Sequence, residues 1–137
     1  MIQLEKWETI ISHGDLTIQN LHWENKFEAI ELKVQIKNIK TDIIYSVICE
    51  YISGFRILDE EGLSEVWTHP DYSLEKMGHT IKIKDNLWSK ESPLSFFHAS
   101  NDGWSYLITT DNECLEIISE KIPIIKNISS LSNVKTH

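Results

Sequence analysis

The sequence predicts a mainly β fold, with antiparallel sheets arranged as a sandwich or a strongly bent meander and room for one short helix within residues 62–92. Apolar and polar residues alternate with a period of two along several segments, as in strands with one buried face. Isoleucine occurs 21 times and alanine only twice, and β-branched side chains favour strands over helices. Turn residues separate the apolar segments at short intervals, which is typical of small β domains.

The first half of the chain contains the clearest strands. Residues 28–39 alternate apolar side chains with charged or polar ones, so one face is expected to be buried. Residues 43–58 are apolar on both parities, which predicts one long strand that is central in its sheet or covered on both faces. Ser53-Gly54 predicts a bulge or sharp bend within it. Residues 2–11 and 16–23 are expected to form a further strand pair.

The middle of the chain mixes strand and loop patterns. Asp59–Gly62 is expected to form a turn, and residues 63–68 a returning strand. Residues 69–73 are expected to be a loop, because the proline at position 70 lacks a donor for a strand ladder. Residues 80–84 alternate again and predict a strand, and residues 85–93 are expected to be a connection.

The C-terminal third predicts a meander of four strands: residues 94–100, 104–110, 114–119 and 122–125. Asp102-Gly103 favours a tight hairpin turn between the first two, because both residues accept positive φ angles. Pro123 places the last strand at a sheet edge or a strand end. We expect one β-rich domain over residues 1–126 and a polar, flexible tail over residues 127–137.

The two cysteines, Cys49 and Cys114, have neither a CxxC partner nor histidines at metal-ligand spacing. The N-terminus lacks the pattern of a secretory signal, and no apolar run is long enough to cross a membrane. We therefore expect a cytoplasmic protein with reduced thiols. Cys49 should pack as a small apolar residue, and the acidic stretch around Cys114 should raise the pKa of its thiol.

The net charge of −8 argues against two classes of binding partner. Binding to nucleic acid or to anionic membranes requires clustered cations, so we expect neither. The excess acid is concentrated in residues 42–75, with a net charge of −7, and in residues 91–120, with a net charge of −6. Such blocks either form a solvated face that keeps the protein soluble or a docking face for a basic partner.

In the docking interpretation, carboxylates steer the partner and aromatic side chains anchor it. The residues expected to contact the partner are Asp59, Glu60, Glu61, Glu65, Trp67, Asp71 and Tyr72. A second acidic group surrounds another turn: Asp111, Glu113, Glu116 and Glu120. The sequence does not distinguish a monomer from a homodimer.

The motifs favour binding over catalysis. The sequence contains no GxSxG, P-loop, GxGxxG or kinase motif, and its histidines lack HxH and HExxH spacing, so we expect no catalytic residue, cofactor or metal. Paired carboxylates in a cleft are a third possibility. The alternative function is a carbohydrate- or ligand-binding β domain that stacks sugars on tryptophans, although tryptophans in a small sheet protein also serve as core. The candidate tryptophans are Trp23, Trp67, Trp88 and Trp104.

The C-terminal segment resembles a family. Residues 104–111 read Trp-Ser-Tyr-Leu-Ile-Thr-Thr-Asp, and a second apolar strand over residues 114–119 and Pro123 follow. This pattern, with residues 96–100 before it, resembles small bacterial immunity proteins encoded beside polymorphic toxins, including those of contact-dependent growth-inhibition systems. Residues 54–67 also resemble these immunity proteins. Together with the C-terminal segment they cover under half of the chain.

The resemblance implies a protein without catalytic residues that neutralises one cognate toxin. Nuclease toxins are commonly basic, because their active sites hold phosphates. An acidic, aromatic surface that covers such a site would imitate the charge of the substrate. The partner implied is therefore the toxin domain, a basic protein.

Overall fold

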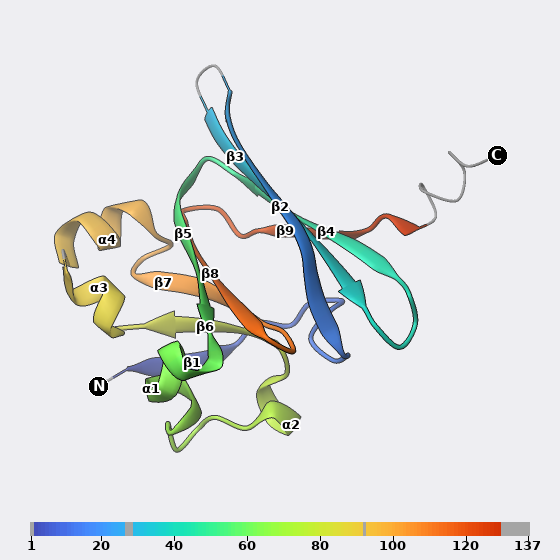
Figure 1. The fold of residues 1–137 in the computed structure, drawn as a ribbon. Helices are drawn as coiled ribbons and strands as arrows, with labels where there is room; N and C mark the ends of the chain where they lie inside the picture. The colour runs from blue at the N-terminus through green and yellow to red at the C-terminus, as the bar shows by residue number, and fades with distance from the viewer. Residues whose placement is uncertain (1, 27–28, 92, 130–137) are drawn as a thin grey trace.

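The computed structural model describes residues 2–26, 29–91 and 93–129, and they form two antiparallel β-sheets (Figure 1). The predicted mainly β fold is thus confirmed. The strands are β1 (Gln3–Lys6), β2 (Leu16–Lys26), β3 (Ala29–Asn38), β4 (Ile44–Glu50), β5 (Ile52–Asp59), β6 (Thr80–Lys84), β7 (Trp104–Thr109), β8 (Glu113–Ser119) and β9 (Ile124–Asn127). The short helices are the 3₁₀ helix η1 (Glu60–Leu63), α1 (Ser64–Trp67), α2 (Leu74–Met77), α3 (Leu87–Glu91) and α4 (Pro93–Ala99).

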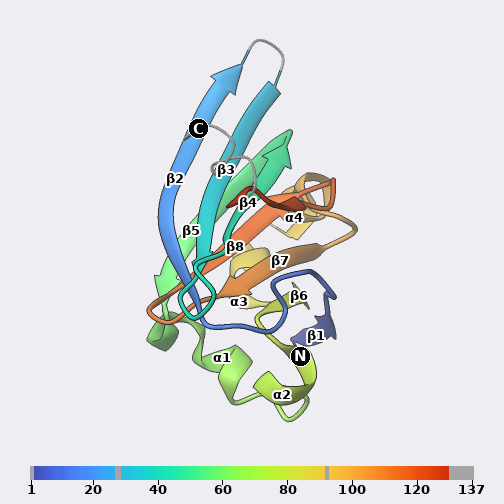
Figure 2. The ribbon, with the colours of Figure 1, turned by 90° about the vertical axis from the view of Figure 1, so that its right-hand side faces the viewer.

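The five-stranded sheet has the order β1-β6-β7-β8-β5, and the four-stranded sheet has the order β2-β3-β4-β9. The four-stranded sheet covers one face of the five-stranded sheet, and α1, α3 and α4 lie on the other side (Figures 1 and 2). β9 is an edge strand, as Pro123 predicted, but it begins at Ile124 and not at residue 122. None of the helices described is long and apolar enough to cross a membrane.

Side-chain alternation along β7 and β8 divides the core into two clusters. Tyr106, Ile108 and Leu115 belong to the cluster between the two sheets, together with buried residues of β3 and β4. Leu107 and Cys114 face the opposite way, into a second cluster under the helices. The five-stranded sheet is therefore covered on both faces, and its strands β7 and β8 are almost wholly buried.

The long strand predicted over residues 43–58 is in fact two strands in different sheets. β4 pairs with β3 and β9, whereas β5 pairs with β8. Tyr51 separates them with a φ of +56°, a left-handed conformation that ends the strand. The bulge expected at Ser53-Gly54 is confirmed, because the pairing register of β5 shifts between Ile52 and Gly54.

Two predicted strands are helices. Residues 63–68 fall in η1, α1 and the residue that follows, because Leu63 and Val66, three positions apart, are both fully buried on one side of these turns. Residues 94–100 fall mostly in α4, where Phe96 is buried against Trp88 and Phe97 is exposed. The predicted hairpin between residues 94–100 and 104–110 is therefore wrong, and β7 pairs with β6 and β8 instead.

Other predictions also require correction. The connection expected over residues 85–93 contains α3. Residues 2–11 and 16–23 do not pair, because β1 pairs with β6 and β2 pairs with β3. At the C-terminal end the backbone N–H of Ile128 still donates to Ile44, and residues 130–137 of the expected tail lie outside the described part of the chain.

Candidate functional site

The acidic segment predicted from the sequence is a rigid corner of the fold. The side chain of Asp59 accepts a hydrogen bond from the backbone N–H of Gly62 at 3.2 Å and so caps η1. Leu63 and Val66 then anchor η1 and α1 in the core beneath the five-stranded sheet. Because these contacts hold the backbone, the intervening acidic side chains are presented from a fixed support.

The structure brings Glu60, Trp67 and Tyr72 together, as the docking interpretation expected. The indole Nε1–H of Trp67 donates to the backbone carbonyl of Glu60 at 2.6 Å. The rings of Trp67 and Tyr72 are in edge contact, with 5.0 Å between their centroids and an interplanar angle of 64°. The aromatic pair is therefore fixed, while the carboxylate of Glu60 takes no part in holding it.

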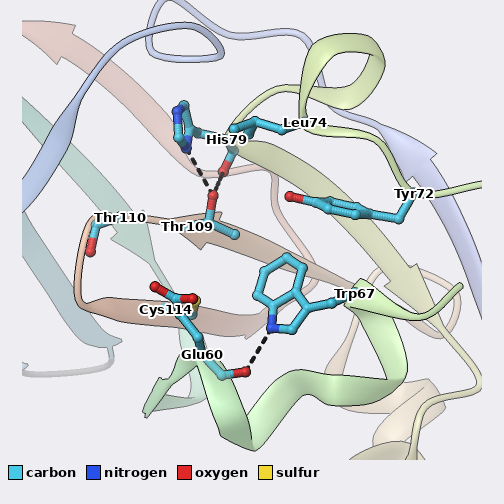
Figure 3. A pocket seen from close by; sticks show the side chains of 8 residues that line it. All are labelled: Glu60, Trp67, Tyr72, Leu74, His79, Thr109, Thr110 and Cys114. Atoms are coloured by element: carbon cyan, nitrogen blue, oxygen red, sulfur yellow. Dashed lines mark hydrogen bonds between the residues drawn. The ribbon is translucent and has the colours of Figure 1, made fainter.

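These three residues form one side of a cavity of about 180 Å³, here named the Trp67 pocket (Figure 3). Its lining residues are Glu60, Trp67, Tyr72, Leu74, His79, Thr109, Thr110 and Cys114. Glu60 and Leu74 are exposed and lie at its rim, whereas Cys114 and Thr109 belong to the buried strands at its base. The hydroxyl of Tyr72 points toward the middle of the group (Figure 3).

Burial favours the neutral forms of three residues in the Trp67 pocket: Cys114, Tyr72 and His79. Burial, with smaller contributions from the carboxylates of Glu60 and Asp59, raises the pKa of Cys114 to about 11. Burial, and then the charges of Cys114 and Glu60, raise the pKa of Tyr72. Burial also lowers the pKa of His79, which disfavours the imidazolium. Glu60 is consequently the residue that can give this pocket a negative charge.

Some polar groups of the Trp67 pocket already form hydrogen bonds within the chain, and others do not. Thr109 Oγ1 lies 3.0 Å from His79 Nδ1, and the Thr110 hydroxyl donates to the backbone carbonyl of Glu113. Among the residues described, no hydrogen-bond partner is found for the Glu60 carboxylate or the Tyr72 hydroxyl. These two groups are thus the ones available to a ligand.

The exposed carboxylates beside the pocket also lack cationic partners among the described residues. No cation in the described part of the chain forms a salt bridge with Asp59, Glu60, Glu61 or Glu65. The pairing of β5 with β8 also places Glu113 opposite Asp59, so the two acidic blocks of the sequence meet here. Glu113 itself lines a different hollow, with Thr17 and Ile18 of β2. We call the carboxylates of the segment that contains η1 and α1 the acidic face: Asp59, Glu60, Glu61 and Glu65.

Asp71 lies in a different hollow, with Pro70 and with residues 2–4 near the N-terminus. The backbone N–H of Asp71 donates to Nδ1 of His69 at 3.0 Å, and Nε2 of His69 lies 3.0 Å from the backbone carbonyl of Ile2. The His69-Pro70-Asp71 loop therefore ties the middle of the chain to its N-terminus. Of the predicted partner-binding residues, Asp71 is the one that the structure places in another hollow.

The second acidic group is not a single surface. Glu116 is only 1% exposed and accepts hydrogen bonds from Arg56 at 2.8 and 3.0 Å, from Asn86 at 2.9 Å and from Ser105 at 2.7 Å. Glu120 lies near the Ile52–Ser119 end of the β5–β8 pair, away from the end where Asp59 pairs with Glu113. The expectation of a surface that includes Glu116 was wrong, because this residue faces the helix-covered side of β8.

The four candidate tryptophans lie on four different elements, and three have partners within the chain. Trp67 contacts Tyr72, the guanidinium of Arg56 lies 4.4 Å from the ring centre of Trp88, and the Lys82 and Lys84 ammonium groups lie 5.3 and 5.6 Å from that of Trp104. Trp23 is 51% exposed on β2. This arrangement provides no shared stacking platform. Within the described residues, no group of three or more His, Cys, Asp or Glu side chains is placed to hold a metal ion.

The sequence interpretation missed the half of the Trp67 pocket formed by Leu74, His79, Thr109 and Thr110. Thr109 and Thr110 lie about forty residues from the acidic segment in the sequence, and only the strand pairing brings the two together. The presence of a histidine beside a predicted strand, at position 79, was the one local signal that was available.

Comparison with known proteins does not assign the chain to a family. No family model matches it, and no solved structure matches it. It is similar to a putative F-box/LRR-repeat protein of Arabidopsis thaliana, with 24% identity over 121 residues. The matched part is 86% of this chain but only 30% of that protein. A leucine-rich-repeat protein contributes one strand from each repeat of about 20–29 residues to a regular stack. The strands described here are instead paired antiparallel throughout.

Proposed function

We propose that this chain is an immunity protein that binds and neutralises a cognate bacterial toxin in the cytoplasm. The toxin would be a basic protein, a nuclease, whose active site is covered by the acidic face and by the aromatic pair Trp67 and Tyr72. The observation that carries the proposal is that a rigid, anchored segment displays carboxylates without cationic partners in the described part of the chain.

Electrostatics supports this choice. Carboxylates without internal partners leave a negative potential at one corner of the molecule, and such a potential accelerates encounter with a basic partner. Anchoring by Leu63 and Val66 means that little backbone freedom is lost when the complex forms, which favours affinity. The surface needs no catalytic group, because blocking the active site of a nuclease is sufficient to neutralise it.

The test is binding to the C-terminal domain of a toxin-like protein encoded beside this chain. Charge reversal by Glu60→Lys with Glu65→Lys is expected to weaken binding by about 100-fold or more, as for truncated interface charges. The matched control is Glu50→Lys with Glu120→Lys, which makes the same charge change near the opposite end of the strands. The control is expected to bind within about threefold of the natural chain.

Two further results bear on the proposal. The association rate should fall steeply as salt is raised, because the encounter is driven by screened charges. Binding that survives the Glu60 and Glu65 reversal and does not depend on salt would remove the acidic-face version of the function. Neutralisation itself is read from the growth of cells that express the toxin domain with each variant.

The carbohydrate-binding alternative predicts quenching of tryptophan fluorescence by sugars. Because the tryptophans lie on separate elements and three of them contact other side chains, no observation in the structure favours this alternative over the proposed one.

A further inference from the structure

We propose that the Trp67 pocket is a receptor for one arginine side chain of the protein partner. The proposal rests on the proposed function for the source of that arginine, and it adds the chemistry by which the acidic face would hold its partner. The pocket itself is defined by the lining residues, whichever protein supplies the side chain.

The size of the pocket suits a guanidinium group. A protein cavity of about 150 Å³ is large enough to bind benzene. The Trp67 pocket, at about 180 Å³, therefore has room for a planar guanidinium and the methylene next to it. Leu74, 49% exposed at the rim, offers apolar surface to the rest of an arginine stem.

The chemistry of the walls also selects a cation. Trp67 and Tyr72 supply aromatic rings, which attract cations through the negative potential of their faces. Arginine suits such a site better than lysine, because its planar guanidinium stacks on rings and is more weakly hydrated. His79 is held neutral by burial, so no positive charge in the lining opposes the ligand.

The two unbonded polar groups match the donors of a guanidinium. The Glu60 carboxylate accepts strong, charge-assisted hydrogen bonds from N–H groups. The Tyr72 hydroxyl can accept one more. The hydroxyls of Thr109 and Thr110 are engaged within the chain, so they shape the base of the pocket but do not compete for the ligand.

The surface next to the Trp67 pocket has room for the partner's backbone beside the inserted arginine. A second hollow, lined by Gly14, Asp15, Asn38, Lys40 and Thr41, shares Leu74 and His79 with the Trp67 pocket. An extended segment carrying the arginine therefore has a continuous path across these two shared residues. This geometry fits a loop or strand of a protein better than it fits a free amino acid.

The experiment titrates ¹⁵N-labelled protein with N-acetyl-arginine amide and follows the Trp67 indole N–H and the Thr109 and Thr110 amides by NMR. N-acetyl-citrulline amide is the neutral isostere and serves as the ligand control. We expect saturable shifts with a Kd of about 1–10 mM for the arginine probe. The citrulline probe should bind at least about fivefold more weakly, because it lacks the charge.

Glu60→Gln and Glu61→Gln form a matched pair of protein variants. Both remove one carboxylate from η1, but only Glu60 lines the pocket. Glu60→Gln keeps the backbone carbonyl that holds the Trp67 indole, so the pocket should keep its shape. We expect about fivefold weaker binding of the arginine probe to Glu60→Gln and a change of less than about twofold for Glu61→Gln.

The arginine pocket is overturned by the absence of saturable shifts at about 50 mM probe, by equal binding of the citrulline probe, or by equal effects of the two glutamine variants. These measurements need no toxin, so they fail independently of the proposed function. Arginine binding with an unchanged toxin affinity in the charge-reversed variant would support the pocket and remove the acidic-face version of the proposed function. Loss of toxin binding in the charge-reversed variant, without any response of the natural chain to the arginine probe, would support the acidic-face function and overturn the arginine pocket.

Discussion

The carboxylate of Glu116 lies against the guanidinium of Arg56, with 2.8 Å between Oε1 and Nη2. The side chain of Glu116 is 1% exposed and that of Arg56 is 28% exposed, so the pair is largely removed from water. Asn86 and Ser105 donate to the other carboxylate oxygen, and Trp88 lies beneath the guanidinium. The network therefore joins β5, β7 and β8 to α3.

Removing one member of this pair is expected to be costly. Arg56→Met should lower the free energy of unfolding by about 3 kcal/mol, because it leaves a buried carboxylate without its cation. Replacing both residues, as Arg56→Met with Glu116→Leu, should recover part of that loss. The control is Lys82→Met, which removes a more exposed ion pair with Glu5 and should cost less than about 1 kcal/mol. Urea denaturation measures all three, and equal losses for the two single variants would contradict the prediction.

Gly78 is required by its position after α2. It has a φ of +72°, and a Cβ there would lie 2.4 Å from the backbone oxygen of Ser12. Gly78→Ala is therefore expected to cost about 3 kcal/mol or more, or to prevent folding. Gly54→Ala is the control, because its Cβ would meet only Ile118 at an ordinary 3.8 Å. A loss under about 1 kcal/mol is expected there, and the two Tm values would show the difference.

His79 should make stability depend on pH. Burial lowers its pKa in the folded state, while in the unfolded chain the pKa is close to its ordinary value of about 6.5. Between these values the unfolded state binds more protons, so stability falls as the pH is lowered through about 6.5 toward the folded pKa. His79→Gln should reduce this pH dependence between about pH 7.5 and 5. An imidazole that titrates above 6.5 by NMR would contradict the prediction.

The thiols of the native protein should react slowly. Burial raises the pKa of Cys49 to about 12 and that of Cys114 to about 11. At pH 8 only about one thiol in a thousand would then be ionised at Cys114, against about one in four for a free cysteine. A colorimetric thiol reagent should modify both residues only in denaturant. The Cys49→Ala variant isolates Cys114, and its rapid modification in the folded state would refute the expected burial.

Local alternation was enough to predict β3 and β6, because one buried face leaves a period of two in the sequence. It was misleading at residues 94–100, where alternation coexists with Pro93 at the first position of α4, a favourable place for proline. It also hid the break at Tyr51, since both halves of residues 43–58 are apolar. Which sheet each half joins depends on strands that lie far away in the sequence.

The site was predictable only in part, for the same reason. Glu60, Trp67 and Tyr72 lie within thirteen residues of one another, so their clustering is visible in the sequence. Glu116 was wrongly predicted to lie on the surface, because it stands among other acidic residues in the sequence. Its burial depends on Arg56, which lies opposite it on the neighbouring strand. Arg56 is the one arginine beside twelve lysines, and this contrast was a usable signal, since arginine is favoured in buried ion pairs.

The left-handed residue at Tyr51 has a consequence for synthesis on the ribosome. β2, β3 and β4 can pair as they emerge, but β5 on the other side of Tyr51 must wait for β8, and β1 must wait for β6. A nascent chain that stops before residue 119 therefore carries unpaired strand edges, which favour aggregation. Truncated forms should accumulate in inclusion bodies, and the full chain should become protease-resistant in a single late step.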